Sequence, residues 1–182
     1  MSRIGRLPVE IPAGVTVTVD DNNLVTVKGP LGELSQQVVK DGSIKVEVKE
    51  NLVHVTRSCD DKDIKALHGL YRKLIFNMVE GVTKGFSKTL VVNGVGYKVA
   101  KKGNNVVMNV GYSHPVEIVP PAGITLDVNG TNEIVVKGIN KEVVGQVAAN
   151  IKFVKIPDPY HAYGVRYSDE VIVRKEGKTA GK

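Results

Sequence analysis

The segment PAGVTVTVDDNNLVTVKG, residues 12–29, returns later in the chain as PAGITLDVNGTNEIVVKG, residues 121–138. The two copies align without a gap, because 121 − 12 and 138 − 29 both equal 109. In the first copy, residues 15–19 alternate apolar and β-branched residues with period two, and residues 24–28 repeat the pattern after a turn at residues 20–23, which is typical of half-buried strands. The sequence therefore predicts an internal duplication of one small structural module.

Strand-like runs continue after the first copy at residues 32–39, 43–48 and 52–57, separated by turn residues. From Asp61 the apolar residues recur three and four positions apart, which is the period of a helix. The apolar face of this helix consists of Ile64, Leu67, Tyr71, Leu74, Ile75 and Met78.

The ends of this helix are suggested by single residues. Ser58 with Asp61 resembles a capping box at the start, and Gly81 suits the end. The face opposite the apolar one carries Lys62, Lys65, His68 and Arg72. We interpret that face as solvated rather than as a binding surface.

Strand-like runs at residues 88–92, 95–100 and 106–110 precede the second copy, and a helix follows it. Asn140 suits the start of this helix. Its apolar stripe consists of Val144, Val147, Ala148, Ile151 and Val154. We therefore predict an α+β fold that is a tandem duplication of a small antiparallel sheet packed on one helix.

The predicted organisation has three parts: a first α+β repeat domain at residues 1–82, a second at residues 83–175, and a flexible basic tail at residues 176–182. Residues 1–82 contain 11 basic and 11 acidic residues, whereas residues 83–182 contain 14 and 8. The second half thus carries the whole net charge of +6, and such an excess favours polyanionic partners.

Several classes of protein do not fit this sequence. The single cysteine, Cys59, cannot form an intramolecular disulfide and fits a reducing compartment. No apolar run approaches the roughly 20 residues that span a bilayer, and the N-terminus MSRIGRLPVE lacks a secretory signal. We therefore expect a soluble, cytoplasmic protein without a membrane partner.

Residues that carry catalysis show no converging pattern. The four histidines have no metal-ligand spacing among themselves or with Cys59. Ser113 and His114 are neighbours in the turn GYSHP, but such neighbours rarely present both side chains to one substrate. The chain has no phosphate-binding P-loop, nucleophile elbow or zinc signature. We expect no catalytic residue, no metal, no cofactor and no small-molecule substrate.

The stretch KFVKIPDPYHAYGVRYSDEVIVRK, residues 152–175, has no counterpart after the first helix. It mixes basic and aromatic residues; cations reach phosphates, and flat rings stack on bases or pack on a surface. The candidate RNA-binding residues here and just beyond are Lys152, Lys155, Tyr160, His161, Tyr163, Arg166, Tyr167, Arg174, Lys175 and Lys178. A second candidate surface, at hairpin ends, consists of Lys101, Lys102, Ser113 and His114.

We expect the cations to hold a phosphate backbone while Tyr160, Tyr163 and Tyr167 stack or pack around the loop that leaves the second helix. For each tyrosine, a structural role as a core or hinge residue stays equally open.

Blocks throughout the chain are similar to those of one family, the bacterial large-subunit ribosomal protein six. They are MSRIGRLPVEIPAG, VKGPLGEL, KALHGLYRKLIFNMVEGV, VNGVGYKV, NVGYSHPVEI, VKGINKEVVGQVAANIKFVKIPDPY and KEGKTAGK. The resemblance covers essentially the whole chain, in order.

The resemblance implies a structural constituent of the large ribosomal subunit, not an enzyme, that binds large-subunit rRNA mainly through its second domain. It implies a place near the sarcin–ricin loop and the stalk base, where translation factors dock. Its partners would be large-subunit rRNA, neighbouring ribosomal proteins at the stalk base and, transiently, translation factors. The alternative is a protein–protein scaffold whose exposed sheet edges pair with partners without RNA.

One segment departs from the family pattern. The family commonly reads Pro-acid-X-Tyr-Lys-Gly-Lys-Gly-Ile/Val-Arg-Tyr where this chain has PDPYHAYGVRY, so His161 and Tyr163 replace two lysines and Ala162 replaces a glycine. With two fewer cations, we expect a smaller salt-dependent contribution to affinity from this stretch. Alanine also takes a positive φ less readily than glycine, so we expect a different loop path.

Overall fold

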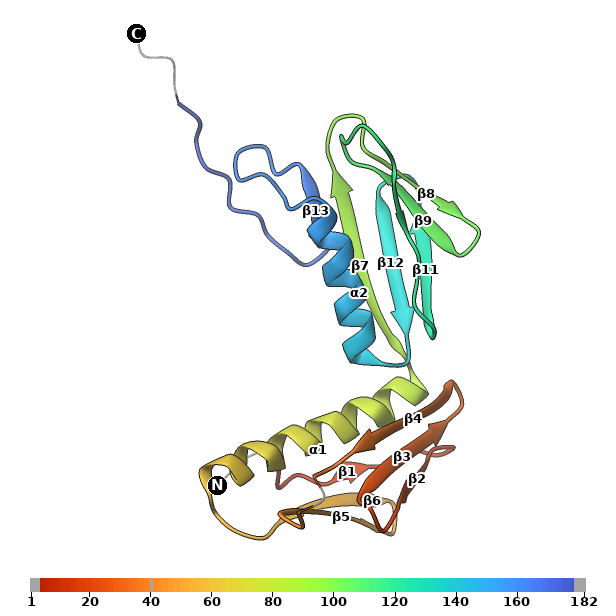
Figure 1. The fold of residues 1–182 in the computed structure, drawn as a ribbon, viewed down its shortest axis with the longest axis vertical. Coiled ribbons are helices and arrows are strands. Elements are labelled where there is room, and N and C mark those ends of the chain that lie inside the picture. Colours follow the sequence, from red (N-terminus) through yellow and green to blue (C-terminus); the bar gives the residue numbers. More distant parts are fainter. Residues whose placement is uncertain (1–3, 40, 179–182) are drawn as a thin grey trace. The chain divides into compact units, whose positions relative to one another are not determined.

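Both copies of the repeated segment fold as hairpins. The first copy forms β2 (Thr16–Val19) and β3 (Leu24–Gly29), and the second forms β11 (Ile124–Asn129) and β12 (Glu133–Gly138). The structure is a computed structural model that describes residues 4–39 and 41–178 (Figure 1). The repeat predicted from the sequence is therefore a repeat of structure.

The contacts among residues divide the chain into two units. The first consists of the chain up to Gly85 together with the short stretch Ile139–Lys141. The second consists of Phe86–Gly138 and the chain from Glu142 onward. The domain boundary between residues 82 and 83 and the tail at residues 176–182 stay predictions, and residues 179–182 lie outside the described part.

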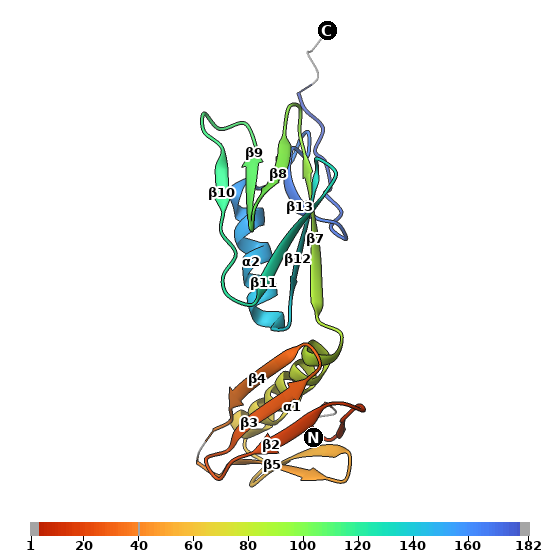
Figure 2. The same ribbon diagram turned by 90° about the vertical axis from the view of Figure 1, so that its right-hand side faces the viewer.

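The first unit contains two three-stranded antiparallel sheets and one helix (Figures 1 and 2). One sheet has the order β2-β3-β4 and the other β1-β6-β5. The further elements are β1 (Val9–Glu10), β4 (Gly32–Gln37), β5 (Ile44–Lys49), β6 (Leu52–Arg57) and α1 (Lys62–Thr83). All five strands predicted after Pro12 are confirmed, and the N-terminal arm adds a sixth, β1, by pairing Val9 with Val53.

Helix α1 differs from its prediction at both ends. Asp61 is the N-cap residue, but its side chain makes no capping hydrogen bond, so the predicted capping box with Ser58 is wrong. Gly81 is buried inside the helix, which continues to Thr83. The Lys84 amide then closes the end by donating to the Glu80 carbonyl at 2.9 Å.

The second unit repeats this α+β construction. Its sheets have the orders β11-β12-β7-β13 and β10-β9-β8. Its other elements are β7 (Phe86–Asn93), β8 (Lys98–Lys102), β9 (Asn105–Asn109), β10 (Val116–Ile118), α2 (Lys141–Val154) and β13 (Gly164–Tyr167). Arg166 and Tyr167, two of the candidate RNA-binding residues, therefore lie in a strand.

The strand pairing extends the repeat beyond the segment visible in the sequence. Val9 pairs with Val53 in the first unit, and Ile118, 109 residues after Val9, pairs with Val106 in the second. Likewise, β4 pairs with β3 in the first unit, and β7 pairs with β12 in the second, so β4 and β7 are equivalent. In the second unit, however, the counterparts of β4, β5 and β6 come before the repeated hairpin rather than after it. The two strand orders are thus circular permutations of each other.

Each unit has its own apolar core between its sheets and its helix. In the second unit α2 buries Val144, Val147, Ala148 and Ile151, four of the five residues of the predicted stripe. Val154, the fifth, packs partly buried against the same core. A fully buried aliphatic side chain of this kind contributes about 1.5–3 kcal/mol, so the helix is held to its sheet mainly by this stripe.

Equivalent glycines allow both helices to approach the repeated hairpins. A methyl group on Gly29 would lie 2.7 Å from the Val82 side chain of α1, and one on Gly138 would lie 2.9 Å from Val144 of α2. On Gly138 it would also lie 2.6 Å from Ile124. Neither helix could keep its position against a larger residue there.

We expect Gly138→Ala to lower the free energy of unfolding of the second unit by about 1–3 kcal/mol, because a buried methyl group would force neighbours apart. Urea unfolding followed by circular dichroism measures the change. The control is Gly145→Ala, where nothing lies within 4 Å of the added methyl on the exposed side of α2. That change should stabilise by about 0.5–1 kcal/mol. Equal effects at the two positions would contradict the prediction.

Candidate nucleic-acid interface

The segment after α2 closes into a compact loop and returns to the sheet. The Val165 amide donates to the Lys155 carbonyl at 2.8 Å, and the Asp158 amide donates to the Tyr163 carbonyl at 3.0 Å. The chain then pairs with the edge of β7, where Val165 lies opposite Val92. Val165 is fully buried, so its side chain anchors β13 in the core.

Asp158 organises the tip of this loop. Its Oδ2 atom accepts hydrogen bonds from the Tyr160 amide at 3.2 Å and from the His161 amide at 2.6 Å, and the His161 Nδ1 atom lies 3.3 Å away. These bonds, above all that from the His161 backbone, lower the pKa of Asp158 below its ordinary value of 3.8. The His161 ring stacks on Tyr163 with centroids 5.4 Å apart.

Ala162 completes the loop in a left-handed conformation, with φ at 60°. Such a φ costs an alanine roughly 1–2 kcal/mol. The alanine thus adopts the conformation that a glycine takes more readily, and its side chain is buried.

The ionised carboxylate of Asp158 accepts the hydrogen bonds that organise the tip. We therefore expect the tip to lose order in acid, where this carboxylate becomes protonated. A lowered pKa in the folded state stabilises the loop fully above pH 3.8, and this stabilisation is lost as the pH falls through the lower folded pKa. The NMR signals of the Tyr160 and His161 amides should report this transition. Asp158→Asn should remove it, whereas a midpoint above 3.8 in the unchanged protein would contradict the assignment.

Lys152 and Arg166, both predicted to bind RNA, contact Glu170 within the chain. The Lys152 Nζ atom lies 2.6 Å from Glu170 Oε1, and the Arg166 Nη1 atom donates to the Glu170 carbonyl at 2.8 Å. Lys152 is the main cause of a lowered pKa of Glu170. With side-chain exposures of only 25% and 28%, Lys152 and Glu170 form a partly shielded ion pair.

The three tyrosines differ in how much surface they offer. Tyr167 packs partly buried against the core, and the ammonium groups of Lys152 and Lys88 lie 5.0 and 5.6 Å from its ring centre. Tyr160 and Tyr163 are 50% and 38% exposed. Stacking on a base is thus open to Tyr160 and Tyr163, whereas Tyr167 already serves the fold.

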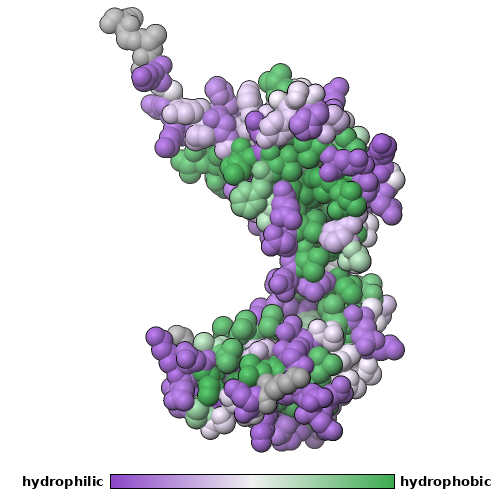
Figure 3. All heavy atoms as spheres, in the orientation of Figure 1, coloured by the Kyte–Doolittle hydropathy of each residue, from purple (hydrophilic) through white to green (hydrophobic). Residues whose placement is uncertain are grey.

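Four cations of the candidate set lie outside this network, and one of them, Lys155, is half-buried. Arg174, Lys175 and Lys178 are exposed, and no ion pair found in the described part of the chain includes them. The Lys175 amide donates to the Pro159 carbonyl at 2.9 Å, which holds this part of the chain beside the loop. Where α2 ends, Phe153 and Ile156 are 71% and 58% exposed, so apolar surface lies among polar groups, as on the face shown in Figure 3.

The four residues of the second candidate surface lie in two separate places. Lys101 and Lys102 lie beside the turn between β8 and β9, and Lys101 pairs with Asp127 at 2.8 Å. Ser113 and His114 follow the opposite end of β9. The structure therefore separates the four residues into two pairs.

Tyr112 instead connects His114 to the first candidate surface. Its ring stacks on His114 with centroids 6.3 Å apart, and the Lys155 ammonium lies 5.1 Å from the ring centre. Its hydroxyl donates to the Val154 carbonyl at 2.8 Å. The sequence prediction missed this residue, although its turn, GYSHP, contains aromatic residues beside a polar one.

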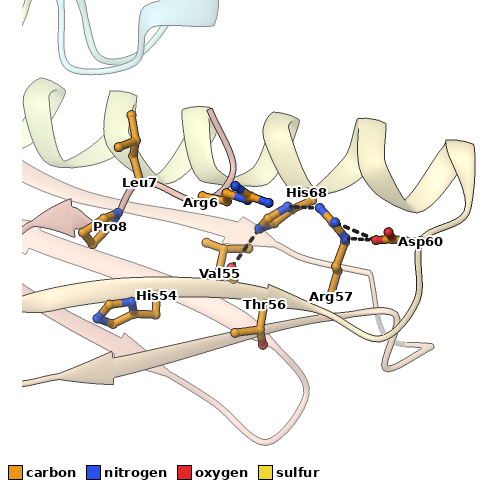
Figure 4. Close-up of a pocket in the computed structure, with 9 residues that line it drawn as sticks. All are labelled: Arg6, Leu7, Pro8, His54, Val55, Thr56, Arg57, Asp60 and His68. Carbon is orange, nitrogen blue, oxygen red and sulfur yellow. Dashed lines mark hydrogen bonds and ion pairs between the residues drawn. The ribbon is translucent and has the colours of Figure 1, made fainter. Parts of the chain in front are cut away.

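The first unit contains a cavity of about 480 Å³, and Figure 4 shows the residues that line it. His68 is 4% exposed there, so its placement on a solvated face is wrong. Arg57, always a donor, donates to His68 Nδ1 at 3.1 Å; Nε2 therefore carries the proton and donates to the Val55 carbonyl at 2.8 Å. Both ring nitrogens are used by the fold, and neither is available as a base.

The described residues contain neither a metal-binding group nor a membrane-spanning helix. No group of three or more His, Cys, Asp or Glu residues able to hold a metal ion occurs within residues 4–39 and 41–178. Nor does any helix in those ranges have the length and apolar character needed to cross a membrane.

Comparisons with known proteins match a family model in two places and several relatives over nearly the whole chain. A family model described as "Ribosomal protein L6" matches residues 11–85 and 93–168. The large ribosomal subunit protein uL6 of Clostridium acetobutylicum is 57% identical over 179 residues, which is 98% of this chain and 99% of the relative. That of a Thermoanaerobacter species is 56% identical over 182 residues, the full length of both chains. That of Shouchella clausii is 55% identical over 179 residues.

Proposed function

The chain belongs to the ribosomal protein L6 family, and from this premise we propose that it binds large-subunit rRNA through the segment after α2. It is a structural constituent of the large subunit of the cytoplasmic ribosome and not an enzyme. The proposed contact comprises residues 155–163 together with the side chains of Arg174, Lys175 and Lys178. It lies near the sarcin–ricin loop and the stalk base, with neighbouring ribosomal proteins as partners and translation factors as transient ones.

The observation that carries the proposal is the pairing of unengaged cations with exposed aromatic rings. Arg174, Lys175 and Lys178 are exposed beside a loop that presents Tyr160 and the stacked rings of His161 and Tyr163. Phosphates attract the cations, and rings stack on unpaired bases or pack against the sugar edge of an RNA helix. The net charge of +6 acts in the same direction.

Salt dependence tests the proposal. We expect the full chain to bind large-subunit rRNA with an affinity that falls steeply with salt. Lys175→Gln should reduce the slope of log K against log[salt] by about 0.7–0.9, the contribution of one phosphate contact. Lys28→Gln is the control. Lys28 is an exposed lysine outside the proposed contact, at the position of the first copy that corresponds to Lys137 in the second. Absence of binding at low salt would reject rRNA binding.

The second candidate function, a scaffold that contacts only proteins, is favoured by exposed apolar side chains in the same segment. Val171 and Val173 are 87% and 83% exposed. A crosslinking map of the protein in the intact large subunit distinguishes the two. Crosslinks from residues 155–178 to rRNA are expected, whereas crosslinks to rRNA chiefly from residues 1–82 would overturn the assignment to the second unit.

A further inference from the structure

Glu170 contacts three parts of the segment at the point where β13 ends. Its Oε1 atom contacts Lys152 at the end of α2, at 2.6 Å, and its Oε2 atom accepts a hydrogen bond from the Tyr167 amide at 3.1 Å. Its carbonyl accepts from Arg166 at 2.8 Å, and its own amide donates to the Tyr167 carbonyl at 3.1 Å. One acidic residue therefore links α2, β13 and the chain that follows.

These contacts distinguish two groups among the cations of the segment, and Lys155, whose ammonium lies over the Tyr112 ring, belongs to neither. Lys152 and Arg166 bind an acidic residue of the same chain and are partly buried. Arg174, Lys175 and Lys178 are exposed, and they follow Glu170 in the chain. The direction in which these three leave the sheet is therefore set where Glu170 is fixed and by the bond from the Lys175 amide to the Pro159 carbonyl.

We propose that Glu170 is a positioning residue for RNA binding, and that Lys152 and Arg166 hold Glu170 rather than RNA phosphate. This inference rests on the proposed function. Holding the chain at Glu170 reduces the conformational freedom that the exposed cations lose on binding, so the contact with RNA costs less ordering entropy.

The sign of one substitution separates positioning from simple electrostatics. Glu170→Gln raises the net charge of the chain by one, and a loss of negative charge beside an RNA-binding surface ordinarily strengthens binding. Positioning requires the opposite: about tenfold weaker binding, the factor expected when a charge-assisted hydrogen bond of about 1.4 kcal/mol is lost. Glu170→Ala should weaken binding further.

Glu176→Gln is the matched control. Glu176 is an exposed acid of the same segment, and it takes part in no ion pair found among the described residues. It makes the same change in charge without touching the contacts of Glu170. We expect it to leave binding unchanged or to strengthen it slightly.

Lys152→Gln provides a second measurement. If Lys152 positions Glu170, this change weakens rRNA binding equally at all salt concentrations and leaves the slope of log K against log[salt] unaltered. If Lys152 itself binds a phosphate, the slope falls by about 0.7–0.9, as for Lys175→Gln. Amide exchange of Val92 in β7 confirms that each variant keeps its core.

The outcomes separate the inference from the function on which it rests. Stronger binding by Glu170→Gln, or a reduced slope for Lys152→Gln, would overturn the inference while rRNA binding stands. Failure of the unchanged protein to bind rRNA at low salt would reject the proposed function and the inference with it. Weaker binding by Glu170→Gln with no change for Glu176→Gln supports the inference.

Discussion

Gly164→Ala should detach the segment after α2 from its sheet and remove most of the affinity for rRNA. A methyl group at this position would lie 2.7 Å from the Lys155 carbonyl oxygen and 2.7 Å from the backbone of Pro157. The backbone φ of +152° is also one that residues with a side chain rarely adopt. Strain and overpacking each cost about 1–3 kcal/mol, so we expect the free energy of unfolding of the second unit to fall by about 3 kcal/mol.

The backbone cannot yield to this methyl group without losing other contacts. Moving residue 164 breaks the bond from the Val165 amide to the Lys155 carbonyl and the pairing of Gly164 with Asn93. Amide exchange of Val165 measures the loss, and rRNA binding gives the functional result. Gly177→Ala is the control, because nothing lies within 4 Å of an added methyl there. Slow exchange of the Val165 amide in Gly164→Ala would contradict the prediction.

His68→Ala should lower the free energy of unfolding of the first unit by about 3 kcal/mol. The change leaves a cavity and removes the partner of the buried Val55 carbonyl, and each effect is destabilising. It also frees Arg57 from one of its contacts. Urea unfolding measures the change in the free energy of unfolding, and amide exchange of Val55 reports the loss of stability at the site.

His114→Ala is the control for this prediction, since His114 is exposed in the second unit. Its stability effect should stay within about 0.5 kcal/mol, as for most surface substitutions. Similar losses for the two histidines would show that burial of the His68 ring contributes little.

The regular parts of the fold were predictable from the sequence because they are long enough to show a period. In β3 the buried Val25 and Val27 alternate with partly buried residues, β12 has an apolar run at residues 134–136, and the stripe of α2 recurs at helical spacing. The repeated segment then related the two units. The short strands β1 and β10, with two and three residues, contain too few positions for any period to appear.

β13 escaped prediction for a different reason. Among its four residues only Gly164 and Val165 are fully buried, and the glycine adds no apolar side chain to the pattern. The segment is a strand because β7 offers it an unpaired edge, and that edge lies about 75 positions earlier in the chain. No local feature of the sequence contains this information.

The candidate site was predicted by composition, and its internal contacts were not. The basic and aromatic residues of 152–178 were recognisable as a group, yet Lys152 and Glu170 are 18 positions apart and Tyr112 and Val154 are 42 apart. Side chains this far apart meet only through the fold. His68 shows the same limit, because both of its partners come from another element.

The pairing of β13 with β7 affects when this protein becomes able to bind its partner during synthesis. The most distant strand pairing of the first unit, between Val9 and Val53, spans 44 positions, whereas the sheet of the second unit is completed by pairing Tyr167 with Leu90 across 77 positions. Non-local pairs of this kind form late, because the intervening chain must first be brought together. The segment proposed to bind RNA is therefore the last to be placed, and a chain released early would fold its first unit yet lack the interface.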